Sequence, residues 1–155
     1  MSAKASYPFS LQPFDKPVPM VATADIGRMA ADLLQETWSG SRVVEFEGPW
    51  RVTPDEIAAT LADLLGRPVR MAAVPRDNWE SLFKSQGMQN PTPRIRMLDG
   101  FNQGWIEFGN GEAGSRKGTV TLETVLRALV LHECKSYALP ETNREIFFII
   151  IQESI

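Results

Sequence analysis

The pattern of hydrophobic and polar positions is clearest between residues 43 and 66, where it predicts a strand, a turn and a helix. Two valines and a phenylalanine at its start favour the strand. Thr53 can cap the helix, Pro54 suits the first helical position, and Glu56 lies three residues after the cap, as in a capping box. Apolar residues then recur at helical spacing until Gly66, which suits the left-handed residue that ends a helix.

Similar units flank this one on both sides. Residues 19–22 form a short apolar strand candidate, and a helix beginning at Thr23 or Asp25 follows, with apolar side chains three and four residues apart. Residues 69–74 alternate well enough to be another strand. This alternation of strands and helices predicts the α/β class, a partial Rossmann-like fold with a small, mostly parallel sheet and a helical substrate-side subdomain.

Aromatic residues gather in two predicted helices after Pro75. We interpret Trp79, Phe83, Phe101 and Trp105 as candidates for a substrate cleft, because aromatic rings on facing helices can form an apolar slot for a planar ligand. Plain core packing is the alternative, and the helical spacing of these rings favours it. Glycines in the second helix favour close packing or a ligand against the backbone.

Residues 109–118 are predicted to be a loop. Their Gly-x-Gly-x-x-Gly spacing matches a dinucleotide-binding turn, but that turn needs a buried strand before it and a helix start after it, and Ser115 to Gly118 do not start a helix. Thr121 is expected to cap a last helix. The sequence therefore predicts no cofactor-binding residue in this segment.

The ends of the chain differ from its middle. Four prolines in the first 19 residues predict an extended N-terminal arm, residues 1–18, before the α/β region of residues 19–131. Residues 132–155 form a tail in which Phe147–Ile151 is β-prone and too short to span a membrane. This run is either a strand that completes the sheet or a segment foreign to the domain.

Composition removes several function classes. A formal charge of −3 with scattered basic residues argues against nucleic-acid binding, and no segment is long and apolar enough for a membrane span. A single cysteine, Cys134, excludes an internal disulfide and fits the cytoplasm, and it forms no metal site with the lone His132. No tyrosine has a lysine one helical turn away, so the sequence predicts no dehydrogenase catalytic pair.

Several motifs in order resemble the C-terminal half of the NmrA-like proteins, which are atypical short-chain dehydrogenase relatives that bind NAD(P) on a Rossmann fold. The motifs are Pro19 to Gly27, Glu47 to Pro49, Thr53 to Ala58, Leu65 to Val69 and Asp99 to Gly104. The resemblance implies that residues 79–105 correspond to the substrate-side subdomain. In that family the phosphate-binding turn lies in the N-terminal half, so no cofactor residue is carried over, and NAD(P) is implied only for the full-length family.

The resemblance leads to two functional expectations. The first is a truncated relative of NAD(P)H-dependent quinone reductases that carries the substrate-side portion and lacks catalysis of its own, which leaves its status as an enzyme open. The second is a non-enzymatic binding or redox-sensing regulatory module that acts through a partner or a second copy. A small planar apolar ligand is the expected small-molecule partner. A folded fragment without a role is the remaining alternative.

Overall fold

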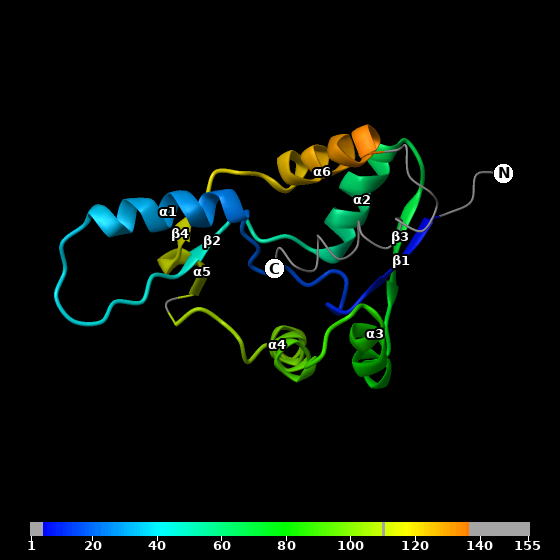
Figure 1. Ribbon diagram of the computed structural model, residues 1–155, viewed down its shortest axis with the longest axis horizontal. Helices are drawn as coiled ribbons and strands as arrows, with labels where there is room; N and C mark the ends of the chain where they lie inside the picture. Colours follow the sequence, from blue (N-terminus) through cyan, green and yellow to red (C-terminus); the bar gives the residue numbers. More distant parts are fainter. Residues whose placement is uncertain (1–4, 110, 137–155) are drawn as a thin grey trace.

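The computed structural model describes the backbone of residues 5–109 and 111–136 and the side chains of residues 6–109 and 111–131. It consists of two lobes (Figure 1). One contains α1, β2, α5 and β4, and the other contains the remaining helices and the β1–β3 pair. In chain order the elements are β1 (Ala5–Phe9), α1 (Thr23–Gln35), β2 (Phe46–Glu47), α2 (Pro54–Leu65), β3 (Val69–Ala73), η1 (Arg76–Asn78), α3 (Trp79–Ser85), α4 (Thr92–Gln103), α5 (Gly111–Gly114), β4 (Arg116–Lys117) and α6 (Leu122–Ser136).

Helix α2 has the start and the end that its sequence predicts. The Thr53 hydroxyl accepts a hydrogen bond from the Glu56 amide at 3.1 Å, and the Glu56 carboxylate accepts one from the Thr53 amide at 2.7 Å, which completes the capping box. Pro54 occupies the first turn, and Gly66 ends the helix with φ 61°. The same argument holds for α6, where the Thr121 hydroxyl accepts from the Thr124 amide at 3.2 Å.

The strands pair in parallel, and the α/β class is confirmed. Strand β1 pairs with β3 from Ala5 opposite Val69 to Phe9 opposite Ala73, and β2 pairs with β4. The expectation of one sheet containing residues 43–46 and 69–74 is wrong. Of residues 43–46 only Phe46 belongs to a strand, β2, and β2 and β3 lie in different two-stranded sheets.

The N-terminal arm is more regular than its prolines suggest. Five of its residues form β1, whose Phe9 is 1% exposed in the core. Among the described strands β1 pairs with β3 alone, and a strand at a sheet edge tolerates a proline such as Pro8, which lacks an amide donor. Residues 5–9 of the arm are thus part of a sheet, whereas residues 10–17 are irregular.

Two other segments differ from expectation. Residues 19–22 form no strand; the chain makes one antiparallel bridge, Val18 with Val52, and then enters α1 directly. Part of the predicted loop 109–118 is ordered as α5 and β4, because the amides of Arg116 and Gly118 donate to the carbonyls of Glu45 and Glu47 at 2.8 and 2.7 Å.

The apolar core lies in the lobe of the β1–β3 pair. Its members come from β1, α2, β3, α3, α4 and α6 and from the segments that join them. In the other lobe, Asp25 is the one buried residue of α1, and Glu47 of β2 is also buried. In the α1 lobe, buried carboxylates therefore make the interior contacts that apolar side chains make in the other lobe.

Residues 137–155, including the Phe147–Ile151 run, lie outside the described residues, whereas residues 132–136 continue α6. Within the described part of the chain, no helix combines the length and apolar character needed to cross a membrane.

Candidate functional site

The structure separates the four aromatic residues predicted to form a substrate cleft. Trp79 and Phe83 are 2% and 0% exposed and belong to the core, where the Trp79 indole N–H donates to the Val74 carbonyl at 2.9 Å. Phe101 packs against that core from α4 and is partly buried. Trp105 lies beyond the end of α4 and is 58% exposed. Two of these rings are therefore core residues, and one is a surface residue.

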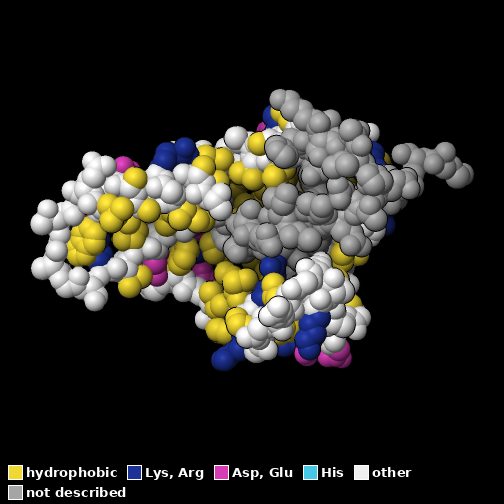
Figure 2. Space-filling model, viewed as in Figure 1, with side chains coloured by type: hydrophobic (Ala, Val, Ile, Leu, Met, Phe, Trp, Pro, Cys, Tyr) yellow, Lys and Arg dark blue, Asp and Glu magenta, His cyan; other side chains and the backbone are white. Residues whose placement is uncertain are grey.

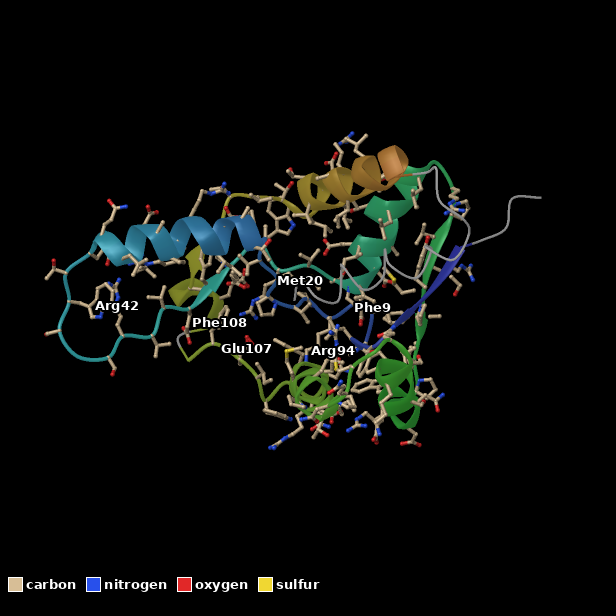
Figure 3. The ribbon with its side chains drawn as sticks, in the orientation of Figure 1. Phe9, Met20, Arg42, Arg94, Glu107 and Phe108 are labelled. Atoms are coloured by element: carbon tan, nitrogen blue, oxygen red, sulfur yellow. The ribbon has the colours of Figure 1, made fainter. Side chains whose placement is uncertain are left out.

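A different part of the molecule contains a cavity of about 440 Å³. Its wall comes from residues within the segments 20–24, 48–52 and 120–129, together with Ile57 of α2. The cavity thus lies between the start of α1 and the side of α6, and Figure 3 shows Met20 between the two lobes. Among the described residues that line it, only two, both threonines, have polar side chains. Ligand cavities are typically roughly 300–1,000 Å³ and mostly apolar.

Close backbone contact holds two of these wall segments together. The Gly48 amide donates a hydrogen bond to the Met20 carbonyl at 2.7 Å, and a side chain at position 48 would place its Cβ 2.7 Å from the same oxygen. Val18 and Val52 exchange hydrogen bonds of 2.9 and 3.1 Å on the same pair of segments. Only glycine fits at position 48, because any Cβ would clash with the Met20 carbonyl. This close approach holds the two wall segments together.

Asp25 ties the start of α1 to the segment that leads into α6. Its carboxylate is 3% exposed and accepts hydrogen bonds from the amides of Thr119 and Val120 at 2.9 and 2.8 Å, and from Arg28. Burial raises the pKa of Asp25, but these hydrogen bonds outweigh burial and hold the pKa below its ordinary value. The ionised carboxylate thus fixes two walls of the cavity relative to each other.

Glu47, which precedes Gly48 in the chain, also joins two distant segments. Its carboxylate is 1% exposed and accepts from Ser115 Oγ and Lys117 Nζ, both at 2.5 Å, and from Arg51 Nε at 3.1 Å. Burial raises the pKa of Glu47, but Lys117, Ser115 and Arg51 outweigh burial and keep the pKa below its ordinary value. The carboxylate holds β4 and the turn before it against β2.

The Arg51 guanidinium extends this cluster toward the surface. It contacts Glu107 at 2.7 Å and lies over the Phe108 ring, 5.7 Å from the ring centroid. Both Glu107 and Phe108 lie near β2 in Figure 3. These charges pair with one another, and none of the residues in this cluster lines the cavity. We therefore interpret the cluster as the support of the cavity wall.

The described lining of the cavity has no ionisable side chain. Among its described lining residues there is no carboxylate, amine, imidazole or thiol. In the same part of the chain, no three histidine, cysteine or acidic residues gather as metal ligands. The described part of the wall is therefore an apolar surface with two threonine side chains.

Sequence patterns did not point to this cavity, because its wall combines segments that are distant along the chain and mostly irregular. Trp50 is the one available signal: a tryptophan directly after a Gly-Pro turn and before a helix cap, here 51% exposed at the cavity. Comparison of the chain with known protein families and with curated protein sequences finds no match.

Proposed function

We propose that the chain is a binding module for a small planar apolar molecule, equivalent to the substrate-side portion of an NmrA-like, quinone-reductase-type protein and without catalysis of its own. The proposal assigns no NAD(P) binding to this chain alone; NAD(P) is implied only as the cofactor of the full-length family. A cytoplasmic location and the absence of nucleic-acid partners, expected from the single cysteine and the acidic charge, are part of the same proposal.

The observation that carries the proposal is the apolar cavity between α1 and α6. Its volume of about 440 Å³ suits a ligand of one to three rings, and the described residues of its wall offer contact area without ionised groups. Three of the motifs that resemble the NmrA-like proteins, residues 19–27, 47–49 and 53–58, contribute to this wall. The resemblance and the cavity therefore share these three segments, whereas residues 79–105, which the resemblance relates to the substrate-side subdomain, do not line the cavity.

Equilibrium dialysis against duroquinone tests the proposal. This planar quinone is fully substituted, so it has no free ring position for addition of the Cys134 thiol. We expect saturable binding to the wild-type chain and at least tenfold weaker binding to Ala128→Phe, because Ala128 lines the cavity from an exposed position on α6 where a larger side chain leaves the fold intact. Ala31→Phe, an exposed position on α1 away from the cavity, is the matched control.

Two results would overturn the proposal. One is the absence of saturable binding by the wild-type chain, and the other is equal affinity of the wild type and Ala128→Phe. NADPH oxidation by the chain alone, with duroquinone as acceptor, is expected to remain at the rate of buffer. A rate well above buffer would contradict the non-catalytic part.

An interaction module that pairs with a partner or a second copy is the second candidate. Large apolar side chains are exposed on α1 and on the segment that follows it, among them Leu34 at 82%, Val43 at 88% and Trp38 at 47%. Hydrophobic side chains are visible on this lobe in Figure 2. Clustered exposed apolar side chains mark interaction sites. Light scattering should then show an oligomer that Leu34→Glu dissociates, and a compact wild-type monomer that binds no apolar dye would exclude this candidate.

A further inference from the structure

A second hollow lies beside the cavity and has a different chemical character. It is a groove of about 540 Å³ between α2 and α6, which we call the acidic groove. Trp50, Val52 and Leu122 line both the cavity and the acidic groove. A molecule seated in the cavity against these three side chains is therefore adjacent to the groove.

The ionisable groups of the acidic groove are mainly negative. Glu56, Asp63 and Glu123 provide three carboxylates, and Arg127 provides one cation. Arg127 is already paired with Glu123 at 2.5 Å. Glu56 accepts a hydrogen bond from the Thr53 amide, and the Asp63 carboxylate has no hydrogen-bond or ion-pair partner among the described residues. The groove thus carries an excess of two negative charges, which attracts a cation and repels an anion.

Trp50 adds an aromatic face at the boundary. Its side chain is 51% exposed, so part of the indole is available to a ligand. A cation over an indole face is attracted by the ring quadrupole, most strongly for tryptophan among the aromatic residues. An aromatic face with carboxylates nearby is an arrangement that suits an organic ammonium group attached to an apolar body.

We propose that the ligand of this site is an amphipathic organic cation, with a planar apolar part in the cavity and an ammonium group at Trp50 facing the acidic groove. This inference rests on the proposed function, because it assigns a charge to the ligand of the same cavity. A carboxylate-bearing ligand of the same shape would meet the uncompensated charge of Asp63, and a neutral ligand would gain only the apolar contact.

Three naphthalene derivatives of matched shape test the charge preference by isothermal titration calorimetry. They are the cation 1-naphthylmethylammonium, the neutral alcohol 1-naphthylmethanol and 1-naphthaleneacetate, the anion of 1-naphthaleneacetic acid. We expect the cation to bind at least tenfold more tightly than the alcohol and the anion to bind most weakly. Salt at about 0.5 M should reduce the advantage of the cation, since the interaction is partly exposed to solvent.

Asp63→Asn should weaken binding of the cation severalfold and leave binding of the alcohol unchanged. Asp32→Asn, which removes an exposed carboxylate of α1 outside both hollows, should change neither affinity. Equal affinities of the three compounds, or an Asp63→Asn variant that binds the cation as well as the wild type does, would overturn the charge assignment and leave the proposed function standing. Failure of all three compounds to bind would overturn the charge assignment, and together with failure of duroquinone to bind it would overturn the proposed function itself.

Discussion

Replacing Glu47 with alanine tests whether a buried charge cluster, in place of an apolar core, stabilises the α1 lobe. The carboxylate is 1% exposed and accepts from Ser115, Lys117 and Arg51. Removing one partner of a buried ion pair costs about 3–5 kcal/mol, because the remaining charge loses its counterion in a poorly solvated place.

We expect the free energy of unfolding to fall by about 3 kcal/mol, the lower end of that range, because both cations keep another carboxylate partner. Arg51 keeps Glu107 at 2.7 Å, and Lys117 keeps Glu112 at 3.4 Å. If the urea dependence of unfolding is about 2 kcal/mol/M, the midpoint falls by about 1.5 M. Against a total stability of about 5–15 kcal/mol, this loss is large.

Urea unfolding followed by tryptophan fluorescence and by circular dichroism measures the loss. Glu80→Ala is the control, since Glu80 pairs with Lys84 on an exposed surface and its removal should leave the midpoint within error. Glu47→Gln keeps the shape of the side chain without the charge and should fall between the two variants. A Glu47→Ala midpoint within about 0.2 M of the wild type would refute the reasoning, since so small a shift is an order below the expected one.

The remaining predictions concern helix capping, backbone contact and pH. Thr53→Ala removes the α2 cap and should lower the unfolding free energy by about 1 kcal/mol in urea titrations; an unchanged midpoint would count against the cap. Gly48→Ala should cost about 1–3 kcal/mol in thermal unfolding, because the new Cβ meets the Met20 carbonyl, and a stabilised variant would contradict this. Folding lowers the pKa of Asp25 and Glu47, so the unfolded chain takes up protons first as the pH falls below their ordinary values of 3.8 and 4.5, and stability should decrease through that range. A flat stability profile from about pH 6 to about pH 3 would exclude this linkage.

Local signals determined which parts of the fold the sequence could predict. The capping box at Thr53 and Glu56 and the left-handed Gly66 act within a few residues, and α2 begins and ends where they indicate. Strand β4 depends instead on carbonyls of Glu45 and Glu47, about 70 residues earlier in the chain, and no local pattern at Arg116 reports that pairing. The sequence of residues 109–118 therefore predicts a loop, although part of the segment forms α5 and β4.

The candidate site was harder to predict for a related reason. Aromatic residues at helical spacing draw attention, yet Trp79 and Phe83 fill the core. The cavity wall is made of small and aliphatic residues whose types are common throughout the chain. Its position depends on Asp25 and Gly48, whose roles arise from contacts with Val120 and Met20 that only the tertiary structure provides.

The register of β1 has a consequence for the order of folding during synthesis. Phe9 pairs with Ala73, 64 residues later in the chain. At a synthesis rate of about 5–20 residues per second, β1 leaves the ribosome about 3–13 seconds before its partner strand is complete. The capping box of helix α2 is made within four residues, so it does not depend on a distant strand. We therefore expect α2 to form in the nascent chain before the β1–β3 sheet. Until β3 is synthesised, the apolar residues of β1 have no strand to pair with.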